Sequence, residues 1–378
     1  MTLPADSRPA ASLADGAGIR HLAVIGRVPR PSGGEGERAA RDYAASQLRA
    51  LGFDVREERF AFSAFPGRYA TPIAGALLGG TIVAACALSL RSAPATAVVA
   101  VLAAGVMATA LFARWMLADG VLTVPWLRAE GVNLLATRGP VAPRVWLVAH
   151  LDSKSQPLPS AARVAGIVLL AAALVLVLVA LLLTPGAHAP RTLWWVALCA
   201  GAAGALPVMA SVVGARSDGA VDNASGVATV LAAAARIAPG ESVGVLLPSA
   251  EELGLAGARA WVRGRAAAIA VNCDGVDDGG ALVIMYNRPA PARVLAVMRD
   301  AAHSARSGRV RARVMPLGLL TDSTALAAAG WQAVTVSHGS LATLGRVHSS
   351  RDSLQNLRGS SIDHVADVLA RAAGVLAQ

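Results

Sequence analysis

Two adjacent acidic residues, Glu251 and Glu252, follow an apolar run that ends at Leu247. Four more residues of the metal-binding type follow other apolar or glycine-rich runs, namely His150, Asp222, Asp274 and His348. Zinc accepts imidazole nitrogen and carboxylate oxygen as ligands, and a catalytic site keeps one position open for water. Two histidines, three carboxylates and one spare glutamate are enough for two zinc ions ~3.5–4 Å apart and a general base.

The position of each acidic residue indicates a different task. Asp222 precedes an expected helix, where a short and firmly held carboxylate can bridge two ions. Adjacent side chains diverge, so Glu252 can bind a metal while Glu251 takes a proton from the attacking water, whose pKa the ions lower toward ~7. Asp152, two residues after His150, is suited to accept the far ring N–H of that histidine.

Each of these residues also has an ordinary structural explanation when it is taken alone. The glutamate pair could be a solvated face, Asp222 could be a helix cap, and His348 could lie in a surface loop. Asp274 could be a turn residue, with Asp277 and Asp278 as competitors for its place. The conjunction of all the ligand types in one chain favours the metal site.

The composition separates this chain from most soluble proteins. It has 378 residues, of which 55% are hydrophobic and 15% charged, and its mean hydropathy is +0.53. Soluble domains average about 45–50% apolar and about 25% charged residues. The excess indicates a membrane protein or an unusually large core. The formal net charge of +10 does not indicate a nucleic-acid partner, because the arginines are scattered and only 4% of the residues are aromatic.

Four segments without Asp, Glu, Lys or Arg are each long enough to cross a lipid bilayer, which takes about 20 apolar residues. They lie near Ala70–Leu90, Ala93–Phe112, Val164–Leu183 and Leu193–Val213. Short tips join the segments in pairs, so they predict two helical hairpins in an integral, multi-pass protein of the inner or cell membrane. The alternative is that they are buried core helices.

The basic residues near these segments predict the orientation. The hairpin ends next to the polar chain carry Arg68, Arg114, Arg128, Lys154, Arg163 and Arg216, whereas the tips carry only Arg91 and Arg191. Because positively charged ends stay in the cytoplasm, we expect the polar domain on the cytoplasmic side.

Outside the hairpins, short strands alternate with helices. Strands are expected at Phe53–Phe62, Asn133–Ala136, Val145–Ala149, Ser242–Leu247, Ala267–Asn272, Val310–Met315 and Ala333–Ser337. Helices are expected at Glu35–Leu51, Asn223–Ile237, Ala256–Arg265, Pro289–Arg306, Ser323–Ala329 and Ser361–Leu376. This alternation predicts an α/β domain with a doubly wound, largely parallel sheet. Ligands of such sheets bind beyond the carboxyl ends of the strands, where His150, Glu251 and Asp274 stand.

The expected domain boundaries follow from this division. They give a flexible N-terminal segment at 1–32, a discontinuous polar domain at 33–67, 119–159 and 215–378, and hairpins at 68–118 and 160–214.

Five motifs carry a resemblance to a known family. They are His150-Leu-Asp152, Gly219-Ala-Val-Asp222-Asn223-Ala-Ser-Gly226, Glu251-Glu252-Leu-Gly254-Leu-Ala-Gly257, Asn272-Cys-Asp274 and His348-Ser-Ser-Arg-Asp352. With them the chain resembles the di-zinc leucyl-aminopeptidase-like exopeptidases, a family that also holds glutamate carboxypeptidase II and glutaminyl cyclase. The resemblance implies a mixed, mostly parallel sheet sandwiched by helices, into which this chain inserts its hairpins.

The resemblance also assigns roles to residues. It implies Asp222 as the bridging ligand, with Glu252 and His348 completing one zinc site. His150 and Asp274 would complete the other zinc site. Glu251 would be the general base, and Asp152 would orient a ligand. Thr321-Asp322-Ser323 resembles a segment that supports the site.

The implied activity is that of a membrane-embedded metallopeptidase with two zinc ions per chain, most simply an aminopeptidase that acts on a peptide substrate. Val347 departs from the family pattern, since many members carry tyrosine just before the last histidine. The alternatives are a glutaminyl-cyclase-like acyltransferase with one zinc ion, and an inactive membrane scaffold. A transporter is disfavoured, because the four apolar segments contain no Asp, Glu, Lys or Arg to mark a permeation path. No oligomeric state is predicted.

Overall fold

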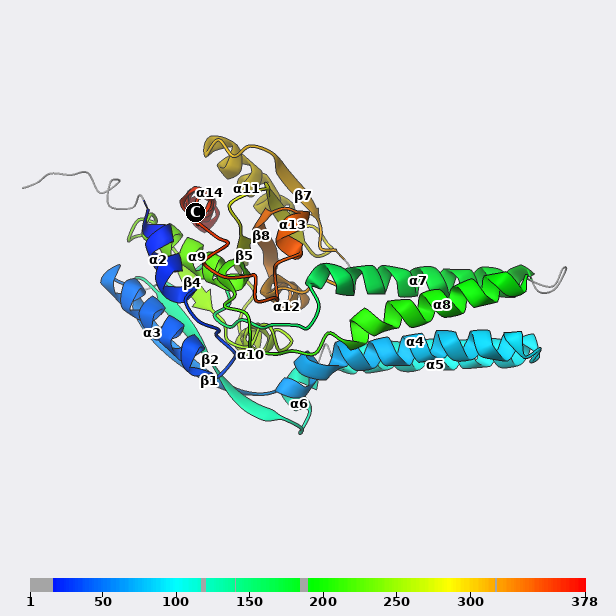
Figure 1. Cartoon of the computed structure of the whole chain (residues 1–378). Coiled ribbons are helices and arrows are strands. Elements are labelled where there is room, and N and C mark those ends of the chain that lie inside the picture. Colours follow the sequence, from blue (N-terminus) through cyan, green and yellow to red (C-terminus); the bar gives the residue numbers. More distant parts are fainter. Residues whose placement is uncertain (1–15, 117–119, 140, 184–189, 317) are drawn as a thin grey trace, which may run out of the picture.

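The computed structural model describes residues 16–116, 120–139, 141–183, 190–316 and 318–378. An α/β domain lies at one end of the molecule, and two helical hairpins project from the same side of it (Figure 1). The tip of the second hairpin, 184–189, lies outside the described residues.

Eight strands form one mixed sheet in the order β1-β2-β4-β3-β5-β8-β6-β7. The strands are β1 (Asp54–Ser63), β2 (Arg128–Thr137), β3 (Val145–Val148), β4 (Val243–Leu247), β5 (Ile269–Val276), β6 (Ala281–Tyr286), β7 (Val310–Val314) and β8 (Gln332–Gly339). The central strands β4, β3, β5 and β8 run parallel, whereas β2 is antiparallel to both β1 and β4, and β6 is antiparallel to β8. The expected mixed, mostly parallel α/β fold is confirmed.

Two elements differ from the expectations. The sequence pattern does not predict β6, because a short apolar run is ambiguous without its partners; in the structure it pairs with β7 and β8. The segment 1–32 is expected to be flexible, but helix α2 (Ala17–Ile25) lies within it, and its Leu22 and Ile25 side chains are buried. Residues 1–15 lie outside the described part of the chain.

Helices cover both faces of the sheet. One face packs against α2, α3 (Glu35–Ala50), α9 (Gly226–Ala234), α11 (Ala292–Ser304) and α14 (Ile362–Ala377), and forms the main core. The other face packs against α10 (Ala256–Val262) and α12 (Asp322–Ala328). Successive side chains of β3 point to opposite faces of the sheet. Leu147 therefore joins the main core, while Trp146 packs on the other face against Trp261, at 4.8 Å between ring centroids. Both layers fix the carboxyl ends of the central strands.

The hairpins consist of four long apolar helices. They are α4 (Thr71–Leu90), which continues the π-helical turn η1 (Pro66–Ala70), α5 (Ala95–Trp115), α7 (Ser160–Leu183) and α8 (Arg191–Met209). Helix α8 packs against both α7 and α4, and α5 packs against α4. Small residues permit this close approach, since a Cβ added at Gly166 would stand 2.7 Å from the carbonyl oxygen of Gly204.

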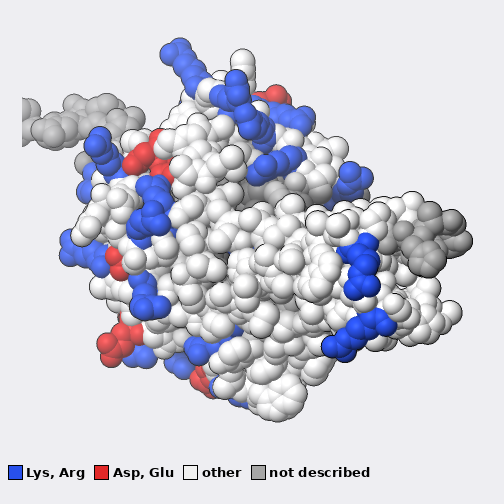
Figure 2. Space-filling model, turned by 45° about the vertical axis from the view of Figure 1, so that its right-hand side comes forward, with Lys and Arg blue, Asp and Glu red and all other residues white. Residues whose placement is uncertain are grey.

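Within the described residues, these four helices are long and apolar enough to cross a membrane. Lysine and arginine gather over the α/β domain, whereas the visible hairpin surface is almost uncharged except near its far end (Figure 2). Helix α7 begins at Ser160, one turn before the expected start near Val164, which brings Ser160 and Arg163 into the helix.

Candidate metal centre

The residues singled out by type converge at one edge of the sheet. His150 follows β3, Glu251 and Glu252 follow β4, and Asp274 lies near the end of β5. Asp222 belongs to the irregular turn η3 (Ala220–Ser225), and His348 follows α13 (Leu341–Leu344). All these residues lie where the carboxyl ends of parallel strands meet, which is the position at which such sheets bind ligands.

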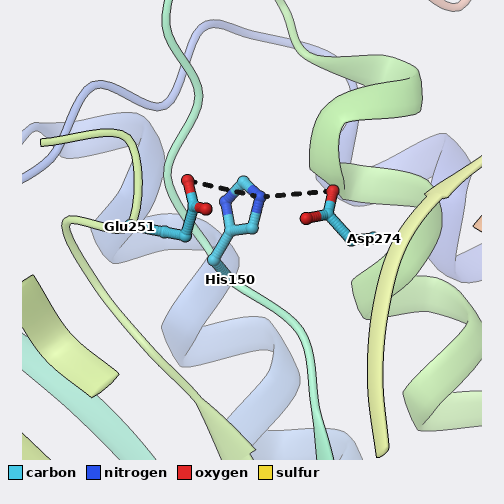
Figure 3. Close-up of side chains that lie close together, drawn as sticks. All are labelled: His150, Glu251 and Asp274. Carbon is cyan, nitrogen blue, oxygen red and sulfur yellow. Dashed lines mark ion pairs between the residues drawn. The ribbon is translucent and has the colours of Figure 1, made fainter. Parts of the chain in front are cut away.

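The side chains form two groups, each with its ligand atoms within 4.8 Å of one another. In the first group the His150 ring lies between the carboxylates of Glu251 and Asp274 (Figure 3). Its Nε2 is 4.0 Å from Glu251 Oε2 and 3.9 Å from Asp274 Oδ1. In the second group His348 Nε2 is 2.9 Å from Asp222 Oδ2 and 3.3 Å from Glu252 Oε1. The structure therefore brings all six side chains together.

Asp222 joins the two groups through its two carboxylate oxygens. Its Oδ1 lies 3.2 Å from His150 Nε2, while its Oδ2 faces His348 Nε2. The expected helix from Asn223 begins instead at Gly226, because Asp222 and Asn223 have non-helical dihedral angles. Asp352 fixes this turn, since its carboxylate accepts the N–H groups of Val221 at 2.6 Å and Asp222 at 3.1 Å. The carboxylate is thus held between the two histidines.

The carboxylate of Asp152 is expected to accept the ring N–H of His150, but it has other partners. The backbone carbonyl oxygen of Asp152 lies 3.0 Å from Nδ1 of His150, whereas the carboxylate Oδ1 of Asp152 is 3.6 Å away. The two carboxylate oxygens instead accept the backbone N–H groups of Glu251, at 3.0 Å, and Glu252, at 3.2 Å. Buried N–H groups beyond a strand end need acceptors, and Asp152 supplies them. The residue therefore orients His150 and the glutamate pair at once.

His348 is held by a residue that the sequence analysis did not single out. Its Nδ1 lies 2.7 Å from Ser160 Oγ, and its carbonyl oxygen accepts the N–H of Gln156 at 2.7 Å. Ser160 is the first residue of the apolar helix α7. No local pattern marks this serine, because its partner is 188 residues away in the chain.

Lys154 is a second residue with a role that the sequence did not indicate. Its position beside a hairpin suggested an orientation signal, but its Nζ lies 2.5 Å from Glu252 Oε2. Burial alone would lower the pKa of Lys154, and the charge of Glu252 raises it above its ordinary value. The ammonium group therefore remains charged beside the carboxylate.

The surroundings separate the two glutamates electrostatically. Burial raises the pKa of Glu251 well above its ordinary value, and neighbouring carboxylates add to this shift against the opposing charge of His150. Burial also favours the neutral form of Glu252, yet the ammonium of Lys154 lowers its pKa to about 2. Paired carboxylates with divergent pKa values are typical of a proton-transfer group beside a permanently charged one.

The donor set fits zinc. It offers only imidazole nitrogens and carboxylate oxygens, and the clustered carboxylates need positive charge between them. In the described part of the chain, the buried Oε1 of Glu252 has no hydrogen-bond partner, although it lies 3.3 Å from His348 Nε2. That oxygen is free to bind a cation.

The competing residues have other partners. Asp277 pairs with Arg346 at 2.5 Å, and Asp278 accepts the N–H groups of Arg358 and Ser360. Neither aspartate competes with Asp274 for the cluster. His338 Nδ1 lies 2.7 Å from the carbonyl oxygen of Asp277, a contact typical of a structural histidine.

Two further positions concern the site. Asp322 is buried, its pKa is raised to about 8 by burial, and His150 opposes that rise electrostatically. This shift favours the neutral form of the Asp322 carboxyl group. Val347, where the resembled family often has tyrosine, packs against the main core.

Comparisons with known proteins find a matching family and several proteins of similar fold. The model of peptidase family M28 matches residues 133–373. An aminopeptidase from Aneurinibacillus sp. strain AM-1 is similar in structure, with a TM-score of 0.56 and 15% identity over 96% of this chain and 95% of that one. A Zn-dependent exopeptidase from Parabacteroides distasonis has a TM-score of 0.55 and 16% identity over 96% and 97%. Glutaminyl cyclase from Porphyromonas gingivalis has a TM-score of 0.54 and 17% identity over 95% and 96%. A search of curated proteins finds no match.

Proposed function

The chain belongs to peptidase family M28, a family of zinc-dependent peptidases, and on that premise we propose that it is a membrane-embedded aminopeptidase with two zinc ions. The proposal rests on Asp222, whose two carboxylate oxygens face the Nε2 atoms of His150 and His348. Two oxygens of one carboxylate directed at two imidazoles suit a pair of ions better than a single ion.

The ligand assignment follows from the two groups of side chains. Asp222, Glu252 and His348 would hold one ion, and His150 and Asp274, together with the second oxygen of Asp222, the other. When bound, zinc lowers the pKa of a water molecule and polarises the carbonyl of the scissile bond. Lys154 keeps Glu252 ionised, and Ser160 directs Nε2 of His348 inward by binding its Nδ1.

Glu251 is the proposed general base. Its pKa is raised, which suits a group that takes a proton from the attacking water and passes it to the leaving amine. Asp152 holds the backbone of both glutamates, so the base and its neighbouring ligand keep a fixed separation. One carboxylate can therefore both accept the proton of the water and return it to the leaving amine.

The decisive experiment uses the full chain purified in detergent and supplied with zinc. We expect two zinc ions per chain. We also expect hydrolysis of peptides with a free N-terminus, but not of N-acetylated peptides. Resistance of C-terminally amidated peptides to cleavage would instead identify a carboxypeptidase. Cyclisation of peptides with N-terminal glutamine, together with one zinc ion per chain, would replace the proposal with glutaminyl cyclase activity. That second candidate is suggested by the fold likeness to glutaminyl cyclases.

The membrane part of the proposal rests on the four apolar helices and on their charge pattern. We propose that both hairpins lie in the lipid bilayer of an inner or cell membrane and that the catalytic domain faces the cytoplasm, because Arg68, Arg114 and Arg163 lie at the domain end. In sealed right-side-out vesicles, added protease should leave the domain intact and cleave it only after detergent is added. Cleavage in sealed vesicles would instead place the catalytic domain on the opposite side of the membrane.

A further inference from the structure

Arg163 lies beside the metal centre although it belongs to α7, one of the four long apolar helices. It follows Ser160 by three residues in the first turn of α7, so the two side chains share one side of the helix. Ser160 contacts His348 on that side. The Nη1 atom of Arg163 is 3.5 Å from Oε1 of Gln156, whose N–H binds the carbonyl oxygen of His348. The first turn of α7 therefore forms part of the wall of the site.

Among the residues that the structure describes, no carboxylate forms an ion pair with Arg163. None of the carboxylates in the described residues lies within 4.0 Å of its guanidinium, and its buried Nε has no hydrogen-bond acceptor among them. The group is near enough to interact electrostatically with Glu252, Asp222 and Glu251, but Lys154 already occupies Oε2 of Glu252. Arginine that is partly buried is normally paired, so an unpaired one beside a site calls for an anion.

Binding of metal ions to the centre would increase the need of Arg163 for a nearby anion. Two divalent ions would balance the four carboxylates of Asp222, Glu251, Glu252 and Asp274. Arg163 would then add a further positive charge near Lys154, which already pairs with Glu252.

We infer that Arg163 binds a carboxylate of the substrate, so that the site prefers peptides with a negative charge next to the scissile bond. This inference rests on the proposed function and gives it a substrate class. A carboxylate matches the planar guanidinium in a bidentate pair. It can come from the C-terminus of a dipeptide or from an acidic side chain that follows the cleaved bond.

The experiment separates the two sources with four substrates. They are Leu-Leu as the free acid, Leu-Leu amide, Leu-Glu amide and Leu-Gln amide, and each is tested on the full zinc-loaded chain in detergent. A charge-assisted pair contributes about 10- to 100-fold in kcat/KM. We expect that preference for the free acid over the amide if the C-terminus is recognised, and for Glu over Gln if the side chain is recognised.

The variant Arg163→Gln should bring the relevant ratio close to one, and Arg163→Lys should give an intermediate ratio. Arg216→Gln is the matched control, because Arg216 is an exposed arginine at the other base of the same hairpin, and it should keep the wild-type ratio. Zinc content verifies that each variant is folded. Equal ratios in wild type and Arg163→Gln would overturn the inference.

Equilibrium binding keeps this test independent of hydrolysis. The same four peptides are titrated by calorimetry into the Glu251→Gln variant with and without Arg163→Gln. A carboxylate preference that Arg163→Gln removes supports the inference even if no peptide is cleaved, in which case the proposed peptidase activity alone would fail. Equal affinities for all four peptides in the presence of Arg163 would overturn the inference. Any hydrolysis that is observed would then not depend on recognition of a carboxylate by Arg163.

Discussion

Ser160 Oγ lies 2.7 Å from Nδ1 of His348, so the first residue of a membrane-type helix holds the ring of a candidate zinc ligand. The ring can then present Nε2 to Asp222 and Glu252. Partners of this kind fix the tautomer and the direction of a metal-binding imidazole. The second hairpin is therefore connected to the chemistry by a hydrogen bond as well as by the chain.

Removing that hydroxyl should weaken zinc binding. In Ser160→Ala the Nδ1 atom of His348 loses its partner, and we expect zinc affinity to fall about 10-fold or more. Ser160→Thr retains a hydroxyl and should restore most of the affinity. Ser211→Ala is the control, because that hydroxyl binds the carbonyl oxygen of Pro207 at the end of α8. Competition with a fluorescent chelator measures all three, and equal affinities would show that the contact has no positioning role.

Replacing the proposed base should separate binding from turnover. We expect Glu251→Gln to retain two zinc ions while kcat falls by about 10²- to 10⁴-fold, because an amide cannot accept the proton. The exposed Glu130 on β2 provides the control Glu130→Gln. Metal analysis and peptide assays on the same preparations decide the matter. Loss of a zinc ion in Glu251→Gln would instead make Glu251 a ligand, as its place beside His150 and Asp274 allows.

Removing the bridge should affect both ions. In Asp222→Ala, each histidine loses the carboxylate oxygen that faces its Nε2, so we expect fewer than one zinc ion per chain. Asp274→Ala should lose one ion and keep the other, since Asp274 belongs only to the His150 group. Asp277→Ala, which alters a carboxylate paired with Arg346, should keep both. Equal metal content in Asp222→Ala and Asp274→Ala would argue against a bridge.

His21 should make the fold sensitive to mild acid. Its Nδ1 lies 2.8 Å from the Tyr43 hydroxyl, and burial, with help from Arg20 and against Asp363, lowers its pKa to about 4. The unfolded chain therefore binds a proton near pH 6.5 while the folded chain does not, so stability is complete above pH 6.5 and decreases as pH falls toward 4. For this half-buried ring we expect a loss of about 1–2 kcal/mol.

The test of this pH effect is the thermal midpoint in detergent between pH 7 and pH 4.5. His21→Gln should show a smaller decrease than the wild type, because it removes one proton-binding group from the unfolded chain. His303→Gln is the control at an exposed histidine of α11 and should follow the wild type. A His21→Gln curve parallel to that of the wild type would assign the acid sensitivity to other groups.

Much of the fold and of the centre was within reach of the sequence. Residue type and alternation are local properties, and the strands before His150 and Glu251 are marked by both. The hairpin helices could be predicted because uncharged apolar stretches of bilayer length are typical of membrane-spanning helices. The run at β6 could not be interpreted in the same way, since its partners lie elsewhere in the chain.

The sequence by itself determined which side chains could bind metal, the strand ends that carry them, and the four apolar helices. Only the tertiary structure decided that Asp152 holds the glutamate pair, that Lys154 pairs with Glu252, and that Ser160 meets His348. These contacts join residues about a hundred or more positions apart, so their distances depend on how neighbouring strands and the second hairpin pack together. Periodicity reports which face of one element is buried, but not which distant polar group will meet it there.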